Sequence, residues 1–480
     1  MAGVCECQSY TTVAPFDLSS DDITGGSLRR ALVVLATPIL VQQLVLVGQQ
    51  LVDVFWLGRL GPDPVAAVGL VAPIVGLLTV GSYVAYTGGQ VLVSQHVGAG
   101  DRIAARRVGF HAVVFVGVVN LLFAAGVALG ARPLVGLFDP GARVAGFAAT
   151  YLAILAFAHV FGGMSDAIEA GFVGWGDSRT PMLVNLVAVG TNVVLDPFLI
   201  FGWGPFPAWG IAGAAAATMA GYALGLAVGI GATTLDRTDF GFTRDAIGFR
   251  FETLRDLLRV GVPRAGQEAG RQVARLAVVG VVAAVGGAAG LTAYTVGARV
   301  ASIAFVPAIA VGSAATSLVG QNLGADQPHR AHRATWLGVT GGTSLIGAVG
   351  LLQFFAPVSI AHLFVPDLTG QALVLTVGYL QILALGYWAL GAIYTVQAGF
   401  DGASRTEIPM YATLAQYWGV RVPAAVVGAY VLGVGVWGAF WGVTLSNVVA
   451  ALGLGGYFSY AVRNGLFDRA TETQGAADAD

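Results

Sequence analysis

Long apolar runs follow one another along the chain, separated by short stretches that carry charges, glycine or proline. A helix needs roughly 20 apolar residues to cross the roughly 30 Å hydrocarbon core of a bilayer, and twelve runs reach that length. They lie at about 28–57, 64–97, 103–130, 142–175, 180–203, 209–234, 255–286, 290–322, 329–355, 369–400, 405–433 and 437–462. No segment alternates polar and apolar residues with a period of two, which disfavours a membrane β-barrel. The pattern predicts an all-α integral membrane protein with twelve transmembrane helices.

The second half of the chain repeats the first at an offset of 226 residues. Residues 94–101 (SQHVGAGD) recur as 320–326 (GQNLGAD), and residues 178–180 (SRT) recur as 404–406. Because each copy holds an even number of spans, the two copies should form six-helix bundles related by an axis along the membrane normal. The predicted divisions are an N-terminal tail (1–27), a first bundle (28–234), a linker (235–254), a second bundle (255–462) and a polar C-terminal tail (463–480).

The arginines set the expected orientation, because positively charged loops remain in the cytoplasm. If the N-terminus is inside, sixteen arginines near the helix ends fall on the cytoplasmic side and three on the outside. We therefore expect a multi-pass protein of the cell membrane with both tails and the linker in the cytoplasm.

Composition excludes several classes of function. The chain is 56% hydrophobic and 10% charged, against roughly 25% charged residues in soluble domains. No basic block suggests a nucleic-acid partner, and no phosphate-binding loop, histidine/cysteine metal spacing or Ser-His-Asp set suggests an enzyme. We expect the lipid bilayer and a small molecule as partners, a monomer, and no bound cofactor.

Carboxylates inside apolar helices are expensive and mark candidate functional sites. At about 1.5 Å per residue, Asp53 and Asp196 should both lie roughly 12–14 Å from the outer ends of their helices. Tyr151, Asn192 and Thr218 should lie at the same depth on neighbouring helices. Two carboxyl groups in a low-dielectric layer cannot easily both carry a charge, so one of them should take up and release protons. The same oxygens could instead coordinate Na⁺, with Asn192 as a further ligand.

The repeat provides an internal comparison for this layer. The second-copy counterparts are Val422 for Asp196, Trp418 for Asn192, and Val278 or Val279 for Asp53. A purely structural requirement would act on both copies. The loss of the acids from the second copy therefore favours an ion site confined to the first bundle.

Other polar side chains are weaker candidates. Those that we expect to line a cavity or to contact a substrate are Gln49, Tyr151, Asp166, Glu169, Tyr387, Tyr394 and Gln397. The two acids in this set share one helix face near the cytoplasmic end, where they could line a wet mouth, pair with loop arginines or pass protons. At helical spacing, Glu268, Arg271 and Arg275 indicate a self-paired structural stripe, and whether these arginines or Arg299 face a cavity stays open.

Several motifs resemble one known family. Residues 174–181 (GWGDSRTP) precede the fifth predicted helix and are echoed by 399–406 before the eleventh, and Pro197 follows the Asn192/Asp196 pair. With twelve helices in two homologous halves, the chain resembles the multidrug and toxic compound extrusion (MATE) transporters over about residues 28–462, and looks closest to their DinF-like prokaryotic branch. The resemblance implies a MATE-like pair of pseudo-symmetric bundles and a secondary active efflux antiporter. Such a protein exports amphipathic or cationic compounds, such as drugs and organic cations, in exchange for H⁺ or Na⁺ by alternating access.

The resemblance also implies residue roles. It places the coupling ion at Asp53, Asn192, Asp196 and Thr218, and it matches Tyr151 to a tyrosine of the fourth helix. The helix-7 glutamate and helix-10 aspartate of the Na⁺-coupled NorM branch have no counterpart here, which favours coupling through the first bundle.

Two other classes of function compete with antiport. A lipid-linked oligosaccharide flippase of the same superfamily would be expected to have 14 helices and a cationic central cavity, whereas this sequence predicts twelve helices and an acidic first bundle. A membrane scaffold or receptor would not need buried carboxylates in one copy only. Proton-coupled export is the leading hypothesis, and Na⁺ coupling is its nearest alternative.

Overall fold

The computed structural model describes residues 20–136, 141–234 and 240–477. Within these ranges the chain is helical and contains no β-strand. Residues 1–19 of the predicted N-terminal tail, 235–239 of the predicted linker and 478–480 of the C-terminal tail lie outside the described residues. The prediction of an all-α protein is confirmed.

The first half begins with a short helix and continues in seven longer ones. These are α1 (Ser20–Gly25), α2 (Leu28–Leu60), α3 (Pro62–Leu78), α4 (Val80–Gly98), α5 (Arg102–Gly136), α6 (Ala142–Trp175), α7 (Arg179–Phe201) and α8 (Ile211–Thr234). The predicted helix at 64–97 is a pair, α3 and α4, bent by 47°.

The second half is more interrupted. Its elements are α9 (Phe251–Ala304), α10 (Val306–Gly324), α11 (Pro328–Phe355), α12 (Pro357–Phe364), α13 (Gly370–Leu385), α14 (Tyr387–Gly402), α15 (Glu407–Leu414), the π-helix η1 (Ala415–Arg421), α16 (Val422–Val426), the π-helix η2 (Val427–Val431), α17 (Val436–Arg463) and α18 (Leu466–Ala477). The predicted helix at 369–400 is the pair α13 and α14, bent by 45°.

The element α9 comprises two helical arms, which meet at Gly287. Gly287 itself is not helical, since its φ is 54° and its ψ is −152°. A backbone with these angles is open almost only to glycine. The first arm corresponds to the predicted helix at 255–286, and the second arm to the beginning of the predicted helix at 290–322, so the predicted boundary between them is where the helix breaks.

The duplication is visible in the bends. The first half breaks between α3 and α4 at Thr79, and the second breaks between α9 and α10 at Phe305, at the same 226-residue offset as the sequence repeat. In the described residues, eight helices are long and apolar enough to cross a membrane, or up to ten if each bent pair is one span. The second arm of α9 together with α10 covers the predicted span 290–322, and the run from α15 to η2, which is partly π-helical, covers the predicted span 405–433.

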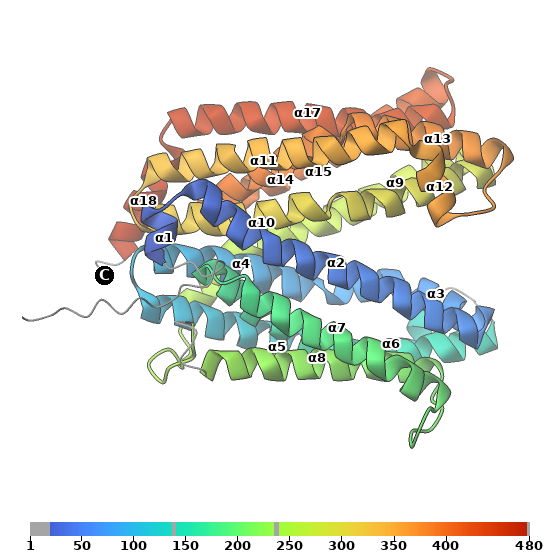
Figure 1. The fold of residues 1–480 in the computed structure, drawn as a ribbon, viewed down its shortest axis with the longest axis horizontal. Coiled ribbons are helices and arrows are strands. Elements are labelled where there is room, and N and C mark those ends of the chain that lie inside the picture. The colour runs from blue at the N-terminus through green and yellow to red at the C-terminus, as the bar shows by residue number, and fades with distance from the viewer. Residues whose placement is uncertain (1–19, 137–140, 235–239, 478–480) are drawn as a thin grey trace, which may run out of the picture.

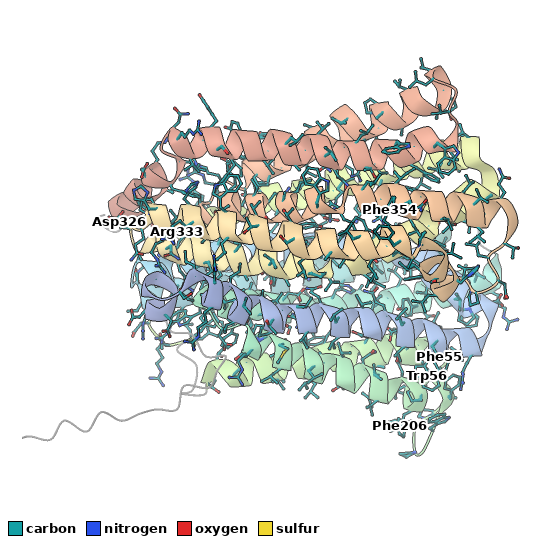
Figure 2. The ribbon with its side chains drawn as sticks, turned by 45° about the horizontal axis from the view of Figure 1, so that its top comes forward. Phe55, Trp56, Phe206, Asp326, Arg333 and Phe354 are labelled. Atoms are coloured by element: carbon teal, nitrogen blue, oxygen red, sulfur yellow. The ribbon has the colours of Figure 1, made fainter. Side chains whose placement is uncertain are left out.

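The two halves lie side by side, with α2, α4 and α10 along the seam between them (Figure 1). The helices α1 and α18 lie at the same end of the molecule, which we call the terminal end (Figure 1). Asp326 and Arg333 also lie at this end, whereas Phe55, Trp56 and Phe206 lie at the opposite one (Figure 2). Aromatic residues at a helix end are typical of a membrane interface.

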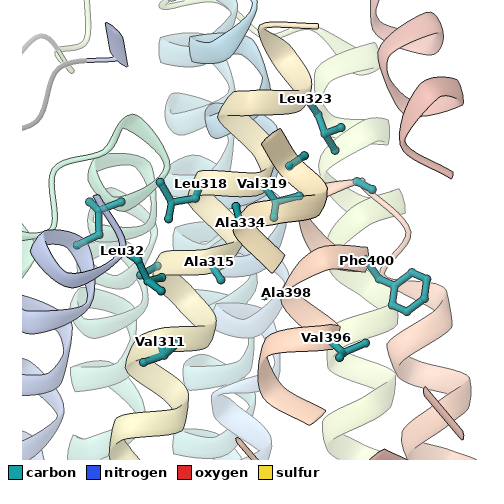
Figure 3. Close-up of a cluster of buried hydrophobic side chains, with 14 of the residues drawn as sticks. Leu32, Val311, Ala315, Leu318, Val319, Leu323, Ala334, Val396, Ala398 and Phe400 are labelled. Atoms are coloured by element: carbon teal, nitrogen blue, oxygen red, sulfur yellow. The ribbon is translucent and has the colours of Figure 1, made fainter. Parts of the chain in front are cut away.

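The N-terminal half of α2, which lies at the terminal end of the molecule, packs against the second bundle. Leu32, Leu35 and Ile39 belong to a buried cluster whose other members come chiefly from α10, α11 and α14. Figure 3 shows Leu32 close to α10, with Val319 and Phe400 on the second-bundle side. The first bundle's leading helix is therefore anchored in the other half of the protein.

The seam is closed at the terminal end by contacts that repeat the pseudo-symmetry. Gln95 Nε2 of α4 donates to the carbonyl of Gly402 in the second half, at 2.8 Å. Its repeat counterpart, Gln321 Nε2 of α10, donates to the carbonyl of Gly174 in the first half, also at 2.8 Å. Each half thus caps the end of a helix in the other, and the structure is closed on this side.

Candidate functional site

Helices α2, α7 and α8 bring a polar cluster together in the first bundle. Gln49 and Asp53 are one turn apart on α2, and Asn192 and Asp196 are one turn apart on α7, so each pair shares a helix face. Thr218 of α8 completes the cluster, and its four partners are buried or half-buried. The predicted layer of Asp53, Asn192, Asp196 and Thr218 is therefore assembled in space.

The amide of Asn192 is the centre of this cluster. One of its polar atoms lies 2.9 Å from Gln49 Nε2 and 3.1 Å from Asp53 Oδ1. Its other polar atom lies 3.3 Å from Thr218 Oγ1. The amide consequently links three helices around one carboxyl group.

Asp53 and Asp196 form the chemical core of the site. Their carboxyl groups are within hydrogen-bonding reach of each other. Asp196 is 1% exposed, and among the described residues no N–H or neutral O–H group donates to either of its oxygens. Buried polar atoms require a partner, and two carboxyl groups can supply one only by sharing a proton or by binding a cation between them. The arrangement is thus suited to reversible occupation by H⁺ or Na⁺.

Two tyrosines lie around the carboxyl pair. Tyr151 of α6, which the sequence predicts, interacts electrostatically with both Asp53 and Asp196. Tyr222 of α8, which the sequence prediction missed, interacts with Asp53 and also with Asp166 and Glu169. The signal for it was available, because Tyr222 stands one helical turn after Thr218 and shares its face.

A second acidic cluster lies on α6. Glu169 accepts hydrogen bonds from Gln42 Nε2 at 2.8 Å, from Ser165 Oγ at 3.0 Å and from Asn185 Nδ2 at 2.5 Å. Its oxygens therefore receive amide and hydroxyl donors, and within the described chain no arginine forms an ion pair with it. Gln42 and Asn185 were also not predicted. Gln42 lies seven residues before Gln49, and Asn185 lies seven residues before Asn192, a spacing of about two helical turns that places each pair on the same helix face.

The predicted second-bundle residues divide into two groups. Tyr394 and Gln397 line a cavity between α9, α14 and η1, and so do Arg271 and Arg275. Tyr387 does not face it: its side chain is fully buried, and its hydroxyl donates to Gln353 Oε1 at 2.9 Å.

The arginine stripe is only partly self-paired. Arg271 forms the predicted ion pair with Glu268, whereas no acidic side chain in the described ranges forms an ion pair with Arg275. The exposed Arg299, on the second arm of α9, is not among the residues that line the cavity.

The MatE family model matches the chain twice, over residues 38–198 and 264–427. The chain belongs to the MATE family. The two matches begin 226 residues apart, so the family comparison and the internal repeat identify the same duplication. A MATE protein is a transporter rather than an enzyme, and this one is a multi-pass membrane protein.

Individual MATE relatives cover most of the chain. The multidrug resistance protein NorM of Burkholderia vietnamiensis is 29% identical over 430 residues, which span 85% of this chain and 89% of the relative. An FAD transporter of Shewanella oneidensis is 26% identical over 416 residues, 84% of this chain and 89% of the relative. Among solved structures, a MOP superfamily transporter from Pyrococcus furiosus superposes with a TM-score of 0.88 at 21% identity, covering 94% of this chain and 99% of that one. This last likeness concerns the fold alone.

We expect Thr218→Val in this MATE transporter to weaken the ion site without unfolding the protein. The hydroxyl of Thr218 bonds to Asn192 and donates to the Ala214 carbonyl at 3.1 Å. Losing the bond to Asn192 should cost about 1 kcal/mol, which is a shift of about fivefold in the ion concentration that gives half-maximal export. The measurement is the export rate against ion concentration in proteoliposomes.

Thr376→Val on α13 is the matched control. The Thr376 hydroxyl is equally buried and donates to its own helix, at the Ala372 carbonyl. Identical ion dependence in Thr218→Val and Thr376→Val would contradict the role of Thr218.

Proposed function

We propose that this MATE transporter is a secondary active multidrug efflux antiporter of the cell membrane, with its terminal end in the cytoplasm. It exports small amphipathic or cationic compounds in exchange for H⁺ or Na⁺, which occupies the Asp53/Asp196 pair. The observation that carries the proposal is this carboxyl pair, with which no arginine of the described residues forms an ion pair and which has no counterpart in the second copy. One relative is named a multidrug resistance protein and another an FAD transporter, and both names support a small-molecule substrate.

Occupation of the site changes the bonding of α2. When Asp53 is ionised, it accepts a hydrogen bond from the Asn192 amide nitrogen, and when it is protonated, it donates to the amide oxygen instead. One polar atom of the Asn192 amide lies 3.1 Å from Asp53 Oδ1, and the amide must turn over for that atom to change from nitrogen to oxygen. Loading with H⁺ therefore removes a charge from the layer and reverses the hydrogen bond between α2 and α7.

The anchoring of α2 supplies a route from the ion site to the seam. Asp53 lies in the far half of this helix, while Leu32 and Leu35 in its terminal half pack against α10. Pro38 lies between them and removes one helical hydrogen bond, so the helix can bend there. A change in α2 at the ion site thus acts on the interface between the bundles, as alternating access requires.

Purified protein in proteoliposomes tests the coupling. An inward H⁺ gradient at equal Na⁺, or an inward Na⁺ gradient at equal pH, is imposed while export of a fluorescent compound is followed. We expect the H⁺ gradient to drive export. Export driven by Na⁺ alone would assign the pair to Na⁺, and export unaffected by either gradient would refute ion-coupled antiport.

A further inference from the structure

The cavity in the second bundle has a volume of about 270 Å³. It lies between α9, α13, α14, the π-helix η1 and α17, and its walls combine tyrosine and arginine side chains with amides. The residues used below are Arg271, Arg275, Tyr294, Tyr379, Tyr417 and Arg421. Drug-sized pockets begin at roughly 300 Å³, so this cavity fits one aromatic ring with a polar group attached, such as the benzoate ring of a larger dye.

The charge of this cavity is positive. Arg271, Arg275 and Arg421 all line it, and none of its described lining residues is acidic. Glu268 neutralises Arg271, but no acidic side chain in the described part of the chain forms an ion pair with Arg275 or Arg421. Arginine in membrane helices normally pairs or marks a substrate pathway, because an uncompensated charge there is costly. The cavity therefore carries two positive charges for which the described chain provides no acidic partner.

The guanidinium of Arg421 is held in place. Its Nε donates to Ser446 Oγ at 2.9 Å, its Nη2 donates to Asn447 Oδ1 at 2.5 Å, and it lies 3.9 Å from the centre of the Tyr417 ring. A fixed planar guanidinium is suited to bidentate binding of a carboxylate or phosphate.

Aromatic rings form another part of the wall. The rings of Tyr294 and Tyr379 stack, with centroids 5.7 Å apart and planes 16° apart. Tyr294 and Arg275 both line the cavity. The cavity thus offers flat apolar surface directly beside a positive charge.

The repeat shows an inversion of charge between the bundles. In the first bundle, α2 and α7 carry Asp53 and Asp196. In the second, Val422 stands at the position of Asp196, and Arg421 directly precedes it. Arg275 likewise lies one helical turn before Val279, a counterpart of Asp53. Corresponding helices thus present acids to one bundle and arginines to the other.

We propose that the second-bundle cavity binds an oxyanion carried by an aromatic ring, such as the carboxylate or phosphate of an exported compound. This inference rests on the proposed export function and assigns a substrate chemistry to the second bundle, while the first bundle keeps the coupling ion. It adds an anionic class of compound to the organic cations that the family resemblance implies.

Two dyes with the same xanthene ring and opposite charge provide the test. Fluorescein is anionic at pH 7.5, and rhodamine 123 is cationic with a methyl ester in place of the benzoate carboxylate. Binding is measured by fluorescence anisotropy on the full chain in phosphatidylcholine nanodiscs, with empty nanodiscs as the baseline. We expect fluorescein to bind at least tenfold more tightly than rhodamine 123.

Arg275→Gln should weaken fluorescein binding by about tenfold, the effect of removing one charge-assisted hydrogen bond, and Arg275→Lys should restore part of it. Arg299→Gln is the matched control, because Arg299 is exposed on the second arm of α9 and is not among the cavity's lining residues. Each variant is checked for folding by size-exclusion chromatography and thermal melting. Equal binding of the two dyes, or equal affinity of Arg275→Gln and Arg299→Gln for fluorescein, would overturn the inference.

The two proposals fail separately. Arginine-dependent binding of fluorescein without any gradient-driven export would refute the antiport and leave the anion site standing. Gradient-driven export without a preference for the anionic dye would refute the anion site alone.

Discussion

Asp53→Asn is expected to abolish ion-driven export while the protein remains folded. Asparagine preserves the volume of the side chain and its bond to Asn192, but it can neither release a proton nor hold a cation. Coupled exchange needs a group at position 53 that binds and releases the ion, so export should fall to the level of empty vesicles. The measurement is export under an imposed H⁺ gradient in proteoliposomes.

The same variant should be slightly more stable than the wild type. The new amide at position 53 can donate to Asp196, whose oxygens otherwise have no donor beyond the Asp53 carboxyl among the described residues. We expect a gain of about 1 kcal/mol in the free energy of unfolding, measured as a rise in melting temperature. If Asp53 had only a structural role, Asp53→Asn would instead lower the melting temperature.

Asp63→Asn is the control for this experiment. Asp63 lies in the first turn of α3 and pairs with the exposed Arg143 at 3.1 Å, an interaction of the kind that contributes little to stability. Export should be unchanged in this variant. Export that survives in Asp53→Asn would refute the assignment of the coupling site.

The sequence was sufficient to predict that the polar side chains of the first bundle lie together, because depth and face follow from helical geometry. Asp53 and Asp196 could be placed in one layer by counting residues from the helix ends, and Asn192 could be placed on the same face as Asp196 by its spacing. The repeat then identified which bundle holds the acids. All three arguments need only residue spacings, which can be read directly from the sequence.

What escaped prediction depends on how helices are rotated and broken. Tyr387 and Tyr394 are both polar aromatics of α14, but only Tyr394 reaches the cavity, because packing against neighbouring helices sets which face turns inward. The bend at Phe305 has no proline at the broken residue itself, and it was not predicted. The donors to Glu169 come from α2, α6 and α7, so two of those three contacts are non-local.

The closed terminal end depends on two glycines at the seam. A Cβ atom at Gly98 of α4 would lie 2.0 Å from the backbone oxygen of Gln321, and one at Gly324 of α10 would lie 2.0 Å from the backbone oxygen of Gln95. These separations are far below a normal contact, and the obstructing atoms are backbone. Only glycine therefore lets the two halves approach as closely as they do here.

We expect Gly98→Ala to prevent closure of this end and to reduce export by about tenfold or more. Forcing a methyl group into such a contact costs about 1–3 kcal/mol, and that cost falls on the closed conformation because the clash lies between the two halves. Spin labels at Ile103→Cys and His329→Cys, exposed positions on α5 and α11, would report a longer distance once Cys5 and Cys7 are replaced by serine. Gly190→Ala on α7 is the matched control, since a Cβ there meets nothing within 4 Å. Because alternating access requires each end to close in turn, unchanged distance and export in Gly98→Ala would mean that closure does not depend on this glycine contact.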